Sequence, residues 1–295
     1  MPLISLGAWS NHTSWFDLGG RSGDTAYDYG DAEQRELGDA VRSAIARGVA
    51  TRDELFVTTK IPCCPAEDWC SVGAGGWWQW PAVGPEKLDG PTTARTDLAK
   101  LAEHNLAMLK LDYVDLMILH FPATSNERSR ECYRVLEELH RHGKARAIGV
   151  SNFDDSQLAS LVASADIKPA VNQIGFGVGK PRTLWMQDLH DGRGDRAAAA
   201  IAKAKELGVQ PTAYGPLGHT TGQGVDSVLR HPVVEAVAKE RGVTSAQVAL
   251  RFLVQQGIGV VTGGNNPLHY AQDVAVVDFE LSDAEMDQLR RISAK

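Results

Sequence analysis

Four residues in the first part of the chain are of the types that make up a proton-donating tyrosine site. Tyr29 follows Asp24 by five positions, and Lys60 and His120 each end an apolar, strand-like run. A phenol has an ordinary pKa of about 10 and is a weak acid at neutral pH. A nearby ammonium group lowers that pKa, and a carboxylate can hold the ammonium in place. A neutral imidazole can orient a carbonyl oxygen beside the phenol, so we expect proton transfer from Tyr29 to such an oxygen.

Each of these residues also has an ordinary structural interpretation. Tyr27 is the local rival to Tyr29, but it lacks the glycine that follows Tyr29, and we expect it to point elsewhere. Lys60 at the end of an apolar run needs a partner if it is buried, and Asp24 is the obvious one. His120 is also compatible with a core histidine whose ring is satisfied by hydrogen bonds. The combination of all four favours the catalytic interpretation.

Short motifs along the chain resemble those of the aldo-keto reductase family. They occur in the family's order and cover nearly the whole chain: Asp-Thr-Ala-x-x-Tyr-Gly at 24–30, Thr-Lys-Ile at 59–61, Leu-Asp-Tyr-Val-Asp-Leu at 111–116, Leu-His-Phe-Pro at 119–122, Gly-Val-Ser-Asn-Phe at 149–153, Val-Asn-Gln-Ile at 171–174, Ala-Tyr-Gly-Pro-Leu-Gly at 213–218 and Asp-Phe-Glu-Leu-Ser at 278–282. The resemblance implies reduction of aldehydes or ketones to alcohols, with hydride from NADP(H) or NAD(H) and the proton from Tyr29. The alternative is a barrel that binds the cofactor in a regulatory role without turnover.

The resemblance also implies the cofactor-binding residues. These are Ser151, Asn152, Gln173, Tyr214, Gly215, Leu217, Gly263, Gly264, Asn265 and His269. The Ser-Asn pair and the glutamine are expected to hold the nicotinamide carboxamide, and the tyrosine to stack on the ring. The family's phosphate-binding Lys, Ser and Arg are replaced here by Gly263, Gly264 and His269. We therefore expect a weaker preference for NADPH over NADH than is usual in the family.

Strand-like runs alternate with amphipathic stretches, which predicts a parallel sheet. The predicted strands are 55–59, 114–119, 147–150, 170–174, 210–214 and 259–262, and the predicted helices are 35–47, 93–109, 127–142, 155–164, 197–207, 233–241 and 246–255. The number of units is close to eight, which favours a single-domain α/β fold, the closed (β/α)8 barrel. In such barrels the chemistry gathers at the C-terminal ends of the strands.

Besides the phosphate-binding residues, two other segments depart from the family pattern. Between Gly7 and Asp24 there is room for a turn at most, so the first barrel helix is expected to be missing or shortened, with Trp15 and Phe16 or another chain covering the sheet. Residues 63–92 form a tryptophan-rich insertion directly after the Lys60 strand. We expect it over the active face, either as a wall for aromatic or bulky carbonyls or as a self-packed surface loop.

The composition of the chain restricts the kinds of molecule that it is expected to bind. A net charge of −7 argues against nucleic acid, and no apolar run reaches the length of a membrane span. Without a signal-peptide pattern we expect a cytoplasmic protein whose four cysteines are free thiols, with no metal site. The expected partner is a small-molecule carbonyl substrate, and the chain is expected to be a monomer or a weak homo-oligomer.

Overall fold

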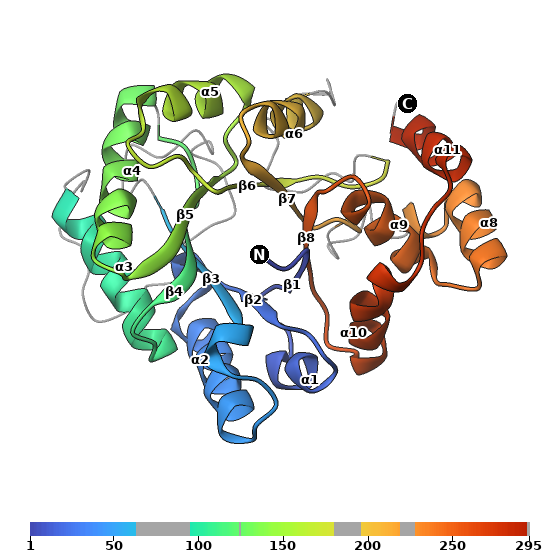
Figure 1. Cartoon of the computed structure of the whole chain (residues 1–295), viewed down its shortest axis with the longest axis horizontal. Helices are drawn as coiled ribbons and strands as arrows, with labels where there is room; N and C mark the ends of the chain where they lie inside the picture. Colours follow the sequence, from blue (N-terminus) through green and yellow to red (C-terminus); the bar gives the residue numbers. More distant parts are fainter. Residues whose placement is uncertain (63–94, 124, 180–195, 219–227, 294–295) are drawn as a thin grey trace.

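Eight parallel strands form a closed barrel in the computed structural model, which describes residues 1–62, 95–123, 125–179, 196–218 and 228–293. The strands are β1 (Ile4–Leu6), β2 (Ser22–Asp24), β3 (Phe56–Ile61), β4 (Val114–Leu119), β5 (Ala145–Ser151), β6 (Val171–Gly175), β7 (Gln210–Tyr214) and β8 (Gly259–Thr262). Each strand pairs with its neighbours in sequence, and β1 also pairs with β8, with Ile4 opposite Val260. The predicted single-domain (β/α)8 barrel is confirmed (Figure 1).

Helices surround the barrel on the outside (Figure 1). They are α1 (His12–Asp17), α2 (Asp31–Ala46), α3 (Arg95–Leu109), α4 (Asn126–Arg141), α5 (Asp155–Ser164), α6 (Arg196–Glu206), α8 (Pro232–Arg241), α9 (Ser245–Val254), α10 (Pro267–Val274) and α11 (Asp283–Ser293), with the short 3₁₀ turns η1 (Tyr27–Tyr29), η2 (Arg52–Glu54) and η3 (Ala275–Asp278). Local signals set several helix starts. The N-caps Asp154 and Thr244 each form a reciprocal pair with a glutamine three residues on, which satisfies amide groups that the first turn leaves unpaired.

The first barrel helix is shortened, as expected, but it is more than a turn. Asn11 caps α1 by accepting a hydrogen bond from the Ser14 amide at 3.0 Å. Trp15 and Phe16 are buried, and the Trp15 indole donates to the Ser22 carbonyl of β2 at 2.9 Å. A Cβ on Gly20 would lie 2.1 Å from the indole, so this glycine is what lets the tryptophan lie flat over the strand. The buried side chains of Trp15 and Phe16 therefore fill the space that further helical turns would occupy.

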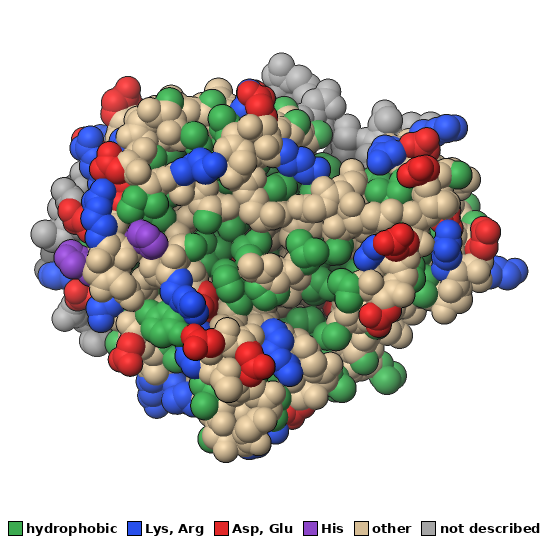
Figure 2. Space-filling view, viewed as in Figure 1, with side chains coloured by type: hydrophobic (Ala, Val, Ile, Leu, Met, Phe, Trp, Pro, Cys, Tyr) green, Lys and Arg blue, Asp and Glu red, His purple; other side chains and the backbone are tan. Residues whose placement is uncertain are grey.

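One end of the barrel is apolar at its centre. Figure 2 shows hydrophobic side chains gathered there, with charged side chains around them. Met1, Phe56 and Val260 help to line a small cavity of about 20 Å³ that reaches Asp24 and Gln173 inside the barrel. A space of that size is enough for about one water molecule. The polar groups of the barrel interior are therefore enclosed by apolar residues on this side.

The described residues bear differently on the cysteines and on the insertion at 63–92. The expectation of free thiols is wrong for Cys132 on α4, which is disulfide-bonded, and the other cysteines lie outside the described residues. The insertion at 63–92 also lies outside them. Among the described helices, none combines the length and the apolar character needed to cross a membrane. In the same part of the chain, no group of His, Cys, Asp and Glu side chains is arranged to hold a metal ion.

Candidate active site

The C-terminal strand ends bring the predicted site residues together. Asp24 ends β2, and the ladder continues one residue further because the Thr25 amide donates to the Thr58 carbonyl of β3 at 2.9 Å. The His120 amide likewise donates to the Ile61 carbonyl at 2.8 Å, directly after β4. Parallel pairing thus places Asp24, Lys60 and His120 on neighbouring strands at one end of the barrel.

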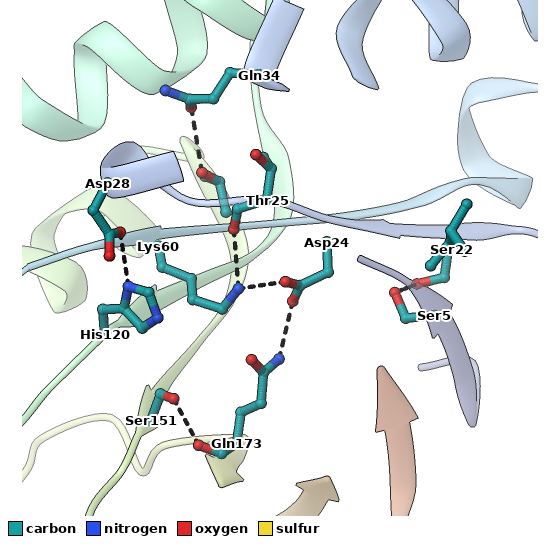
Figure 3. A network of polar contacts seen from close by, with 12 residues as sticks. Ser5, Ser22, Asp24, Thr25, Asp28, Gln34, Lys60, His120, Ser151 and Gln173 are labelled. Carbon is teal, nitrogen blue, oxygen red and sulfur yellow. Dashed lines mark hydrogen bonds and ion pairs between the residues drawn. The ribbon is translucent and has the colours of Figure 1, made fainter. Parts of the chain in front are cut away.

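Lys60 and Asp24 form the expected ion pair inside the barrel. The Lys60 side chain is fully buried, its ammonium group contacts the Asp24 carboxylate, and it also donates to the Thr25 carbonyl at 3.1 Å. The second Asp24 oxygen accepts a hydrogen bond from Gln173 Nε2 at 2.9 Å (Figure 3). A buried charge pair costs desolvation energy, and such hydrogen bonds are what make it tolerable.

Tyr29 lies against both of these groups. It ends the 3₁₀ turn η1, and its ring centre is 4.9 Å from Lys60 Nζ and 5.6 Å from the centre of the His120 ring. Protein encloses most of the ring, and this burial raises the pKa of Tyr29 well above its ordinary value, with the Asp24 and Asp28 carboxylates adding to the rise. The expected lowering of the Tyr29 pKa is therefore wrong. The charge of Lys60 is already neutralised by Asp24.

His120 is held by a carboxylate that the sequence interpretation did not assign. Its Nδ1 lies 2.8 Å from Asp28 Oδ1, and both side chains are buried. Phe121 stacks on the imidazole at 4.4 Å between ring centres. These contacts fix the ring orientation, and the T-shaped contact with Tyr29 places His120 beside the phenol.

The rival tyrosine faces another part of the molecule. The Tyr27 ring makes an edge contact with His104 on α3 at 5.7 Å. Burial and the Asp31 carboxylate both raise the pKa of Tyr27. The contacts described for Tyr27 are thus with α3 and with the start of α2.

Two residues of the site were not predicted. Trp9 has a positive φ of 57°, which is rare for a residue with a side chain, and its ring lies 4.9 Å from the Tyr29 ring while remaining 56% exposed. Asp28 is the second. An acidic residue one position before a tyrosine is not a recognisable signal, and the exposed tryptophan after β1 belongs to no periodic pattern.

The residues assigned to the nicotinamide lie on the adjoining strand ends β5, β6 and β7. Ser151 Oγ donates to the Gln173 carbonyl at 2.6 Å, and the Asn152 amide donates to the His120 carbonyl and to Ser151 Oγ at 2.9 and 3.1 Å. Tyr214 donates from its hydroxyl to Asn152 Oδ1 at 2.9 Å. Asn152 adopts a left-handed backbone with φ 64°, a conformation that asparagine tolerates better than most residues. These neutral groups form one connected patch.

The residues assigned to the remainder of the cofactor lie in two loops. Gly215 has a positive φ of 57° directly after β7, and Leu217 packs on the core nearby. Gly263, Gly264 and Asn265 form the exposed loop between β8 and α10. The loop is tied to the first barrel unit, because the Gly264 amide donates to Ser10 Oγ at 3.2 Å. The Tyr270 hydroxyl donates to the Gly264 carbonyl and accepts from the Asn11 amide at 2.9 Å.

His269 lies on the first turn of α10, beside the side chain of Asn266. Its Nε2 is 3.3 Å from the side-chain nitrogen of Asn266, the residue that caps the helix. The neighbouring Leu268 is 71% exposed. The loop from Gly263 to Asn266 therefore offers backbone amides and asparagine side chains, and it contains no Lys or Arg.

The donor set fits a nicotinamide cofactor. A carboxamide needs one acceptor and one donor, and the Asn152 and Gln173 amides carry both kinds of group within one patch. Tyr214 is partly exposed at the end of β7 and offers a flat ring. Glycine amides at the start of α10 suit a phosphate, because helix N-termini attract anions.

Comparison with known proteins agrees with this geometry. The sequence profile described as the Aldo/keto reductase family matches residues 13–294. The chain belongs to the aldo/keto reductase family. A D-galacturonate reductase of Fragaria ananassa is 30% identical over 93% of this chain and 77% of its own length. A morphine 6-dehydrogenase of Pseudomonas putida is 31% identical over 98% of this chain and 86% of its own.

Solved structures of aldo-keto reductases share the fold. A Bombyx mori aldo-keto reductase in complex with NADP has a TM-score of 0.76 and 25% identity, covering 99% of this chain and 89% of that one. As an aldo/keto reductase, the chain is a nicotinamide-dependent oxidoreductase that acts on carbonyl groups. The non-catalytic alternative is not favoured.

Proposed function

We propose that this chain reduces an aldehyde or ketone by proton transfer from Tyr29, with Lys60, Asp24 and His120 as its supporting groups. The observation that carries the proposal is the position of the Tyr29 ring, whose centre lies 4.9 Å from Lys60 Nζ and 5.6 Å from the centre of the His120 ring. A phenol close to both a cation and an imidazole is placed to donate a proton to an oxygen on which negative charge develops.

The raised pKa of Tyr29 suits the reductive direction. Burial and two nearby carboxylates keep the phenol protonated at neutral pH, so the proton is present before the reaction begins. An alkoxide is a much stronger base than a phenolate, and it takes this proton despite the raised pKa. Oxidation of the alcohol needs the phenolate instead, so that direction is expected to require alkaline pH.

Lys60 and Asp24 act after the proton has moved. The phenolate that remains on Tyr29 lies next to the Lys60 ammonium, whose position is fixed by Asp24 and by the Thr25 carbonyl. Gln173 holds the other Asp24 oxygen at 2.9 Å. The pair therefore stabilises the charge left on the phenol until a proton returns from solvent.

The cofactor site follows from the neutral patch on the other strands. A bound nicotinamide supplies hydride to the carbonyl carbon. Asn152 and Gln173 hold its carboxamide together with Ser151, Tyr214 packs on the ring, and the adjoining loop residues Gly215 and Leu217 enclose it. Phosphate groups are held by the amides of the loop from Gly263 to Asn265.

Cofactor choice follows from the charge of that loop. Gly263 and Gly264 have no side chain to contact a 2′-phosphate, and His269 faces the neutral Asn266 side chain. Charge-assisted contacts are about twice as strong as neutral ones. NADPH is therefore bound with only a small advantage over NADH.

The substrate pocket includes an aromatic wall. Trp9 lies 4.9 Å from Tyr29 and keeps 56% of its surface exposed, which supports aromatic or bulky carbonyl substrates. A monomeric or weakly oligomeric state stays a prediction. The cytosolic compartment also stays one, and the disulfide at Cys132 counts against it because disulfides are rare in reducing compartments.

A cofactor-oxidation assay tests the proposal. NADPH and NADH are each incubated with the protein and a panel of small aliphatic and bulky aromatic aldehydes and ketones. Turnover that disappears in Tyr29→Phe and persists in Tyr27→Phe supports it. Equal turnover by Tyr29→Phe and the parent protein would assign the proton to another group.

A further inference from the structure

Asp28 is a buried acidic residue for which the proposed reaction has no role. It lies within η1, directly before Tyr29, and is 8% exposed. Its Oδ1 accepts a hydrogen bond from His120 Nδ1 at 2.8 Å, across a sequence separation of 92 residues (Figure 3). A buried carboxylate is costly unless it has a partner, so this contact calls for an explanation.

The surroundings of Asp28 keep it ionised. Burial raises the pKa of its carboxyl group, but the charge and hydrogen bond of His120, its own backbone amide and the Lys60 charge outweigh burial, so the Asp28 pKa is below its ordinary value. The His120 ring contacts Asp28 and Tyr29, both from η1, and the Lys60 charge from β3 acts on Asp28. Lys60 is itself paired with Asp24.

An ionised carboxylate decides where the imidazole carries its proton. A carboxylate only accepts hydrogen bonds, so the proton between Asp28 and His120 lies on Nδ1. A neutral ring with its proton on Nδ1 has a lone pair on Nε2 and cannot donate to a carbonyl oxygen. A neutral His120 with its proton on Nδ1 would therefore offer no donor to the substrate oxygen, whereas the neutral imidazole expected from the sequence was assigned the role of orienting it. Only the imidazolium form donates from both nitrogens.

We propose that Asp28 is a positioning residue that holds His120 as an imidazolium, so that Nε2–H donates to the substrate oxygen while Tyr29 transfers its proton to it. This inference rests on the proposed function and deepens it. Protons balance without any contribution from Asp28 or His120, because the alkoxide takes one proton from Tyr29 and both other groups end as they began. The imidazolium stabilises the oxygen charge by a charge-assisted bond.

The consequence for activity is a dependence on pH that follows the His120 proton. In the parent protein, we expect kcat/KM for reduction to fall with rising pH as the Nε2 proton is lost. In Asp28→Asn, the amide no longer supplies the negative charge, and its NH₂ group can donate to Nδ1, which leaves a neutral ring protonated on Nε2. We expect kcat/KM to fall by about tenfold or more at neutral pH, since a charge-assisted bond is replaced by a neutral one. We also expect the decrease with pH to move to lower pH or to disappear.

Asp31→Asn is the matched control. Asp31 lies three residues further along and also accepts from a histidine, His104 Nε2 at 2.7 Å, but that histidine packs against Tyr27. The same chemical change there is expected to leave both kcat/KM and its pH profile unchanged. His120→Gln, a neutral donor at the ring position, should have no histidine step in its profile.

The protonation state is measured independently of turnover by ring-nitrogen NMR on histidine-labelled protein. The proposal requires both nitrogens of His120 to be protonated at neutral pH in the parent protein. A neutral ring would overturn it, and so would a correctly folded Asp28→Asn variant whose kcat/KM and pH profile match those of the parent. Absence of turnover in the parent protein with every carbonyl would contradict the proposed function instead, and the NMR result would still decide the His120 state.

Discussion

Between β2 and β4 the site is built from charged groups, whereas between β5 and β8 it is built from neutral ones. On the first side Asp24 pairs with Lys60 and Asp28 pairs with His120, all four buried. On the second side serine, asparagine, glutamine and tyrosine share hydrogen bonds, and the phosphate loop begins with two glycines.

Two buried carboxylates show what this difference means for ionisation. The pKa of Asp28 is lowered, because His120 and Lys60 outweigh burial. Asp273 on α10 is 6% exposed, and burial raises its pKa to about 6 although Thr262 donates a hydrogen bond to it. In the described part of the chain no ion pair involves Asp273. Charge is thus stabilised on the proton-transfer side of the barrel and disfavoured on the cofactor side.

Removal of the transferable proton is expected to have the largest effect. Tyr29→Phe should lower kcat by about 10²–10⁴-fold, because proton donation to the alkoxide is lost while the ring still fills its place. Cofactor affinity, measured by quenching of tryptophan fluorescence, should stay within about twofold of the parent value, because the neutral side is untouched. A large loss of affinity would show that the two sides are not separable.

Breaking the Lys60–Asp24 pair should affect both activity and stability. Lys60→Met leaves a buried carboxylate without its cation, which is expected to lower the free energy of unfolding by about 3–5 kcal/mol in urea titrations and to abolish reduction. Arg290→Met is the control, since it breaks a 2.6 Å pair with Asp287 whose two side chains are about half exposed. That change should cost at most about 1 kcal/mol. Equal losses of unfolding free energy in the two variants would mean that burial does not determine how much an ion pair contributes to stability.

Adding charge to the cofactor side should change cofactor choice. A Cβ at Gly263 would lie 3.7 Å from Ser10 Oγ, an ordinary contact, so a side chain fits there. Gly263→Lys is expected to raise the ratio of NADPH to NADH affinity by about tenfold or more through a charge-assisted phosphate contact. Gly263→Met, of similar length without charge, should leave the ratio unchanged. A parent protein that already prefers NADPH by more than about a hundredfold would contradict the neutral-loop interpretation.

Substitution of Asp273 should give the smallest effect, and it should raise rather than lower the free energy of unfolding. Because its folded pKa of about 6 lies above its ordinary value, the folded state binds more protons in this window. Stability attributable to Asp273 is therefore lost as pH rises from about 4 to 6. Asp273→Asn should increase the free energy of unfolding at pH 7 by roughly 1–3 kcal/mol and leave it unchanged near pH 4. Asp278→Asn, the same change at a nearby exposed site, should have little effect at either pH.

The sequence predicts the parts of this site that depend on strand ends. Lys60, His120 and Tyr214 end apolar runs, and parallel pairing brings such ends together whatever the details of packing. The strands β1 and β2 were not among the predicted strands, because three residues each are too few for a periodic pattern. The shortened α1 was anticipated because the chain between Gly7 and Asp24 is too brief for a full helix.

Contacts that depend on burial and on distant partners could not be predicted. Asp28 meets a histidine 92 residues away, and no local pattern links the two. The direction of the Tyr29 pKa shift was wrong because the sequence shows which charges are near but not how strongly burial opposes the phenolate. Trp9 was missed because its contact with Tyr29 needs a left-handed backbone, which side chains other than glycine and asparagine rarely adopt.

The shortened α1 has a consequence for how this enzyme can change. Trp9 lines the proton donor, while the next residues, Ser10 and Asn11, bind the Gly264 amide and the Tyr270 hydroxyl that supports the same loop. Three consecutive residues therefore join the substrate wall to the phosphate loop. Tyr270→Phe removes one of these links and should alter the KM for bulky carbonyls together with the cofactor Kd, a joint change that independent subsites would not produce. A mutation in this segment that changes the substrate range is then expected to change the cofactor preference as well, so the two properties evolve together.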